Sequence, residues 1–105
     1  MTKAEIKTLL KDVDPNIRHH YSMRDDGADY TVWEETEREG LIADDHHAEE
    51  GWKFYVHRFT KNENDPIAAA LFLALDAAPE IGVSEEIDHE PETGYIHHIY
   101  TCECA

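Results

Sequence analysis

Apolar residues near the start of the chain recur at the spacing of an amphipathic helix. From Ile6 to Val13 they occupy positions i, i+3, i+4 and i+7, so they share one helical face. Thr2, followed three residues later by Glu5, forms a capping box that marks the beginning of the helix. Asp14-Pro15 marks its end, because proline disfavours helical backbone in the residue before it.

A second helix is predicted from Ile67 to Ala78. Asp65 is a suitable N-cap, and Pro66 takes the first helical position, where its missing N–H costs nothing. The run is rich in alanine and leucine, and Phe72 and Leu73 widen its apolar stripe. A helix with so broad a stripe packs against a sheet on one side and needs cover on another. That cover is expected from the first helix or from a neighbouring subunit.

Alternating apolar and polar residues predict three strands between the helices. The third strand has the clearest pattern, with Trp52, Phe54 and Val56 on one face and Lys53, Tyr55 and His57 on the other. The elements predicted here are a loop at 16–29, a strand at Tyr30–Glu34, a turn at Glu37–Gly40, a strand at Leu41–Ala43, an interruption at Gly51 and a strand that begins at Trp52.

A hairpin closes the chain. Its arms are predicted at Val83–Glu90 and Tyr95–Cys104, and its turn at Pro91–Gly94. The complete order is α-β-β-β-α-β-β, which predicts the α+β class. Two helices are expected to pack on a mostly antiparallel sheet, within a single domain that covers residues 1–105.

Charge is the unusual feature of the composition. The chain has 105 residues, of which 24 are acidic and 9 basic, for a formal net charge of -15. Such a surface repels phosphate backbones, so we expect neither sequence-independent binding to nucleic acid nor adsorption to an anionic membrane.

The sequence also indicates a cytosolic site of synthesis. No run approaches the roughly 20 apolar residues that cross a bilayer. The first residues lack the apolar stretch of a secretory signal. Cys102 and Cys104 are too close in sequence for an unstrained bridge, so we expect reduced, buried thiols.

Histidine is the residue type that most invites a catalytic or metal-binding interpretation. The chain has 8 histidines, including the adjacent pairs His19-His20, His46-His47 and His97-His98. Adjacent residues of a strand point to opposite faces, so at most one of each pair is expected in a shared site.

Two local alternatives remain for these histidines. His46 or His47 could bind a divalent ion with Asp44, Asp45 and Glu49, and Cys102 could lie near His98. Neither matches an established metal or nucleophile–base spacing. The acidic pairs are expected by chance in so acidic a chain. We therefore predict no catalytic residue, no metal ligand and no cofactor.

Large aromatic residues exceed what one sheet face of a small domain readily buries. They indicate a surface for other subunits or partner proteins, although two well-filled core layers explain them equally well. The candidate interface residues are Trp33, Trp52, Tyr55, Phe59, Phe72 and Tyr100.

Several short motifs, taken in order, resemble a family of small tail proteins encoded by tailed phages and by prophages of Gram-positive bacteria. The motifs are Leu41–Glu49, Tyr55–Lys61, Asp65-Pro66 and Glu92–His98. The resemblance covers roughly residues 30 to 103. The last strand departs from the family pattern, because Ile99–Cys102 replaces a more tryptophan-rich ending.

This resemblance implies a structural protein and not an enzyme. Members are minor tail, tail-completion or tail-terminator components whose antiparallel sheet and flanking helices assemble as a ring. The expected partners are other copies of the chain, in a ring for which the resemblance suggests six copies, together with tail-tube and head–tail connector proteins. DNA would pass an acidic lining without tight binding. The protein would be assembled in the host cytoplasm and would reside in the virion tail.

Two other classes of function compete with this interpretation. The net charge is also typical of a small acidic inhibitor or DNA mimic, although the carboxylates are spread along the whole chain. The second competing class is a metal-dependent enzyme that uses the histidines, and it would require bound metal.

Overall fold

Five strands form one sheet in the computed structural model. The structure describes residues 1–20, 27–43 and 46–104. For residues 37–43 and 46–50 it describes the backbone alone. The strands are β1 (Arg18–His19), β2 (Tyr30–Ala43), β3 (His46–Thr60), β4 (Ile81–His89) and β5 (Ile96–Cys104). The helices are α1 (Lys3–Val13) and α2 (Pro66–Ala77).

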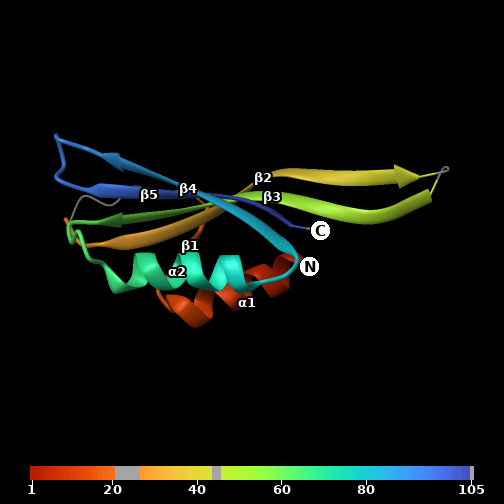
Figure 1. Ribbon diagram of the computed structural model, residues 1–105, viewed down its shortest axis with the longest axis horizontal. Coiled ribbons are helices and arrows are strands. Elements are labelled where there is room, and N and C mark those ends of the chain that lie inside the picture. The colour runs from red at the N-terminus through yellow and green to blue at the C-terminus, as the bar shows by residue number, and fades with distance from the viewer. Residues whose placement is uncertain (21–26, 44–45, 105) are drawn as a thin grey trace.

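The sheet has the strand order β1-β2-β3-β5-β4. Only the short edge pair β1–β2 is parallel, and every other described pair is antiparallel. Both helices lie side by side on one face of the sheet (Figure 1). The predicted α+β class, with two helices on a mostly antiparallel sheet, is confirmed.

The first helix begins as its capping signal predicts. The Glu5 backbone N–H donates to Thr2 Oγ1 at 3.2 Å, and the Thr2 backbone N–H donates to Glu5 Oε1 at 3.0 Å. Asp14 is the C-cap, and its N–H donates to the Leu10 carbonyl. Ile6 and Leu10 are fully buried on the inner face.

The second helix is likewise positioned by its cap. Asp65 accepts hydrogen bonds from the backbone N–H groups of Ile67 and Ala68, and Pro66 opens the helix. The broad apolar stripe is only partly covered. Leu71 and Leu75 are buried against α1 and the sheet, whereas Leu73 remains 69% exposed.

The predicted order α-β-β-β-α-β-β is confirmed, but all three strands before α2 have other bounds than the predicted ones. Arg18–His19, within the predicted loop, forms the edge strand β1. The predicted turn at Glu37–Gly40 is wrong, because β2 runs straight through it, as β3 does through Gly51. Charged residues form a strand here because the backbone of β2 pairs with that of β3 across the hairpin, with register shifts near Thr36 and Leu41.

The final hairpin forms close to its predicted bounds. Gly94 takes the positive φ of 78° that its turn requires, and the Gly94 N–H donates to the Glu90 carbonyl at 2.9 Å. In β5 the even-numbered residues face the helices and the odd-numbered residues face the other side, as predicted.

Each face of the sheet carries its own buried cluster. The larger cluster lies between the sheet and the helices, and its sheet residues include Trp33, Phe54 and Tyr100. The smaller cluster lies on the face that no helix of the described chain covers, and consists of Tyr30, Val32, Phe59 and Tyr95. We call this second side of the sheet the open face.

A buried arginine joins the helices to the sheet. Arg58 points from β3 toward the helix side and is only 4% exposed. Its Nε donates to Asp65 Oδ2 at 2.7 Å, and its Nη1 lies 3.8 Å from Asp14 Oδ2. One guanidinium thus connects the N-cap of α2 with the C-cap of α1.

Among the described residues, neither helix has the length and apolar content that a membrane span requires.

Candidate functional site

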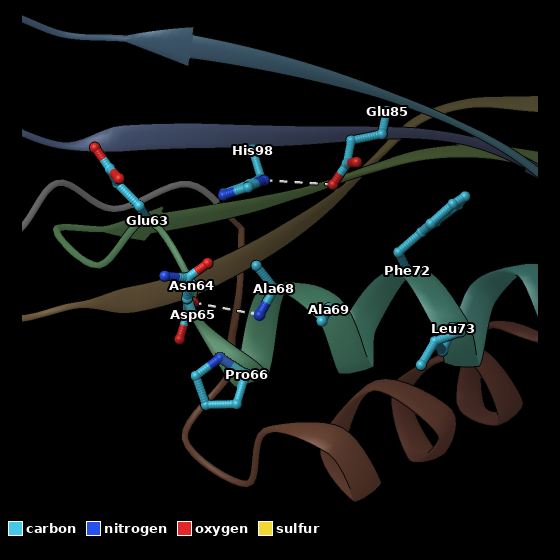
Figure 2. Close-up of a pocket in the computed structure, with 10 residues that line it drawn as sticks. All are labelled: Glu63, Asn64, Asp65, Pro66, Ala68, Ala69, Phe72, Leu73, Glu85 and His98. Atoms are coloured by element: carbon cyan, nitrogen blue, oxygen red, sulfur yellow. Dashed lines mark hydrogen bonds and ion pairs between the residues drawn. The ribbon is translucent and has the colours of Figure 1, made fainter.

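A groove with a volume of about 570 Å³ lies between α2 and the strands β4 and β5. Figure 2 shows its lining, in which Phe72 points from α2 toward the sheet. The lining residues are Glu63, Asn64, Asp65, Pro66, Ala68, Ala69, Phe72, Leu73, Glu85 and His98. We call it the α2–β4 groove.

Polar groups at the base of the α2–β4 groove are already engaged within the chain. His98 Nδ1 lies 3.3 Å from Glu85 Oε2, and the hydroxyl of Tyr100 donates to the Ala68 carbonyl at 2.8 Å. The side chain of Asp65 accepts hydrogen bonds from the first backbone N–H groups of α2. The walls therefore present mainly apolar surface, which suits protein contact better than binding of a small polar molecule.

Two large apolar side chains are exposed beside this groove. Leu73 is 69% exposed and lines it, and Ile87 is 53% exposed on β4. Ile87 pairs with His98, so it lies on the helix side of the sheet, next to the groove. In the sequence, Leu73 stands out only as part of a broad apolar stripe, and no pattern marks Ile87 as exposed.

A hairpin arm extends beyond the rest of the sheet. Strand β5 ends opposite Trp52, so residues 39–43 of β2 and 46–51 of β3 pair only with each other in the described sheet. Figure 1 shows this part of the β2–β3 hairpin projecting past both helices. We call these two segments the hairpin arm.

Three of the six aromatic residues predicted at an interface belong to the chain's own core. Trp33 and Tyr100 are at most 1% exposed on the helix side, and Phe59 is buried on the open face. The alternative explanation, two well-filled core layers, therefore accounts for these three side chains.

The other three aromatic residues are partly exposed, each in a different place. Trp52 packs at the margin of the larger cluster, beside the base of the hairpin arm. Tyr55 lies on the open face, with its ring 5.9 Å from that of His57. Phe72 lies in the α2–β4 groove. The structure thus separates the predicted interface residues instead of bringing them into one patch.

Both cysteines are free and buried. Burial raises the pKa of the Cys102 thiol to about 12, so the thiolate that a nucleophile requires is disfavoured. The idea that Cys102 lies near His98 is wrong, since four residues along one strand separate them by about 13 Å.

The pair His19-His20 departs from the expected alternation. The two rings stack with their centroids 4.0 Å apart, because His20 follows the end of β1 with a positive φ of 69° and turns back. The prediction that only one of the pair could join a site is therefore wrong here. His19, His20 and Glu35 place ligand atoms within 4.8 Å of one another.

Glu35 in that cluster is already neutralised by side chains of the chain. Lys3 Nζ lies 3.0 Å from Glu35 Oε1, and His19 Nε2 donates to the same oxygen at 2.8 Å. The cluster forms an ion-paired connection between α1, β1 and β2, and its carboxylate has little capacity left for a metal.

The other histidine pairs follow the expected alternation where they are described. His98 faces the α2–β4 groove, whereas His97 faces the opposite side and meets His57. The suggested site around His46 and His47 includes Asp44 and Asp45, which lie outside the described residues.

Comparison with protein-family models finds no family that matches this chain, and comparison with curated proteins finds no similar sequence.

Proposed function

We propose that this protein is a structural component of a phage or prophage tail, a tail-terminator or tail-completion protein that forms a ring with copies of itself. The hairpin arm is the observation that carries the proposal. An isolated two-stranded ribbon is at best marginally stable in water. An arm of this length, which pairs with no third strand in the described sheet, gains stability when a partner covers it.

A ring needs two unlike surfaces on each subunit, because the contact between neighbours is head-to-tail. The hairpin arm and the α2–β4 groove are two such surfaces. The arm carries the apolar run Leu41-Ile42-Ala43 within an acidic segment. The groove offers the exposed apolar side chains of Leu73 and Ile87. We propose that the arm of one copy lies against the groove of the next.

The charge of the chain is consistent with a channel for DNA. A net charge of -15 would keep the polyanion from adhering to the ring. Tail-tube and head–tail connector proteins would then bind the two sides of the ring in the virion, after assembly in the host cytoplasm.

The decisive experiment is native mass spectrometry of the purified chain over a concentration series, with two matched variants. Leu73→Glu adds a charge to the α2–β4 groove, and Ala77→Glu adds the same charge to an exposed position near the end of the same helix. We expect a closed ring, with the six copies that the family resemblance suggests, for the unmodified chain and for Ala77→Glu. Leu73→Glu should weaken assembly at least tenfold while circular dichroism shows an unchanged fold.

Two results would contradict the proposal. One is an unmodified chain that stays monomeric at every concentration and also when mixed with tail-tube protein. The other is a phage that lacks the gene but still makes tails of normal length joined to heads. Capture of a basic DNA-binding protein by the monomer would favour the acidic inhibitor instead.

A further inference from the structure

A line of four acidic and histidine side chains crosses the open face near the end of the β4–β5 hairpin. His57 Nδ1 and His97 Nε2 are 2.8 Å apart and share a hydrogen bond. At one end His57 Nε2 lies 3.5 Å from Glu34 Oε1, and at the other His97 Nδ1 lies 3.4 Å from Glu90 Oε2. Asp88 stands directly opposite His97 in the strand register.

Counting protons along this line shows that two neutral imidazoles cannot place an N–H in every gap. The line has three gaps between neighbouring groups, but two neutral imidazoles carry only two N–H groups. If His97 Nε2 donates to His57, then His97 Nδ1 turns a lone pair toward Glu90. If the bond runs the other way, the lone pair of His57 Nε2 faces Glu34. A third proton or a metal ion at that end of the line would remove this repulsion.

Several features favour a metal ion at the His97 end. His97 Nδ1 and the carboxylates of Asp88 and Glu90 lie within 4.8 Å of one another. Two ligands of a tetrahedral zinc ion stand about 3.3 Å apart. The 3.4 Å between His97 Nδ1 and Glu90 Oε2 fits that edge, whereas it is long for a hydrogen bond.

The surroundings orient these ligands. His57 can accept the Nε2–H of His97, which directs the Nδ1 lone pair toward the carboxylates. The ring of His97 also stacks on Phe59, with centroids 4.1 Å apart. The hydroxyl of Thr93 donates to Glu90 Oε1 at 3.1 Å and leaves Oε2 to face His97.

A divalent cation is attracted by the nearby carboxylates and by the net charge of the whole chain.

We propose that His97 Nδ1, Glu90 and Asp88 bind a divalent transition-metal ion of the zinc class, and that His57 is a positioning residue which orients His97. The two carboxylates and one imidazole leave a position for water, as three-ligand zinc sites do. The site lies on the open face, away from the α2–β4 groove. Its presence is therefore independent of the assembly proposed above.

Isothermal titration of the metal-free full chain with zinc chloride tests the site, with native mass spectrometry to count bound ions. We expect one zinc ion per chain. His97→Gln and Glu90→Gln should each weaken binding at least tenfold, and His57→Gln by about ten- to a hundredfold. His89→Gln is the matched control, because His89 is exposed in the same hairpin on the opposite face.

Nuclear magnetic resonance of the imidazole nitrogens distinguishes ligation from a structural role. Zinc should shift the Nδ1 signal of His97 and leave that of His89 in place. Wild-type affinity in both His97→Gln and Glu90→Gln would overturn the proposal, and so would a chain that takes up no zinc. Zinc lost on Cys102→Ser instead would assign the binding to the thiols and also overturn it.

Discussion

At the scale of single residues, Glu35 shows how one carboxylate is stabilised in so acidic a chain. Its side chain is 13% exposed and lies between Lys3 of α1 and His19 of β1. Burial by itself would raise the pKa of Glu35, but hydrogen bonds from Lys3 and His19 outweigh it and lower the pKa from 4.5 to about 2. The charged form is therefore favoured by folding.

We predict that the stability contributed by Glu35 is lost in acid. Because the pKa is depressed in the folded state, the contribution is fully present above about pH 4.5 and disappears as the pH falls toward 2. Allowing for solvent screening, the full effect is about 1–2 kcal/mol. Urea denaturation of the wild type and Glu35→Gln should differ by this amount at pH 6 and by much less at pH 2.5.

Glu103→Gln provides the reference for this comparison. It removes one negative charge from a side chain that is 67% exposed and lies 3.8 Å from Lys53. A difference between the wild type and Glu35→Gln that stayed constant from pH 6 to pH 2.5 would show that packing, and not charge, makes Glu35 important.

Residues of the metal proposal illustrate what a sequence pattern can and cannot indicate. Alternation correctly predicts that His97 and His98 face opposite sides. It does not show that Asp88 and Glu90 lie across the turn from His97, because that depends on the register of the hairpin. In the sequence, this metal site is indicated only by the spacing Asp88-x-Glu90 before a tight turn and by His97 after it.

At the scale of elements, local chemistry predicted the helices well and long-range pairing less well. Thr2 and Asp65 cap their helices as expected, since capping depends on neighbours in sequence. The continuous strand β2 was missed because the charged run from Glu37 to Gly40 carries no strand periodicity. Its conformation is set by pairing with residues 50–53 of β3, the next strand along the chain, and not by its own side-chain pattern.

Arg58 is an element-scale feature that was also missed, although its position could be predicted. It continues the inward-facing series Trp52, Phe54 and Val56, so a charged residue at that place signals a buried partner. The partners are the caps of both helices, Asp65 and Asp14. Burial would raise the pKa of Asp65, but the hydrogen bond and charge of Arg58 outweigh burial and lower it.

We predict that Arg58→Ala destabilises the fold by about 3–5 kcal/mol, because two buried carboxylates lose their cation. Equilibrium urea denaturation measures the change in the free energy of unfolding. Lys53→Ala is the matched control on the same strand, and its partly exposed ion pair should contribute no more than about 1 kcal/mol. Equal effects of the two substitutions would mean that Arg58 does not join the helices to the sheet.

At the scale of the whole molecule, charge opposes the assembly that the apolar surfaces favour. Each copy carries a formal charge of -15, so neighbouring copies repel each other. In the proposed ring, the α2–β4 groove and the exposed Leu73 and Ile87 beside it would supply an apolar attraction that is insensitive to screening. The balance between charge repulsion and apolar attraction depends on the salt concentration.

We therefore predict that assembly strengthens as the salt concentration rises. The Debye length falls from about 30 Å at 0.01 M to about 8 Å at 0.15 M, so repulsion between whole subunits is largely removed over this range. Sedimentation velocity at these two concentrations should show the dissociation constant falling about tenfold. Binding to a basic partner would respond in the opposite direction, since salt weakens attraction between opposite charges. Assembly that weakened with salt would thus exclude an apolar contact at the groove and indicate an interface built on ion pairs.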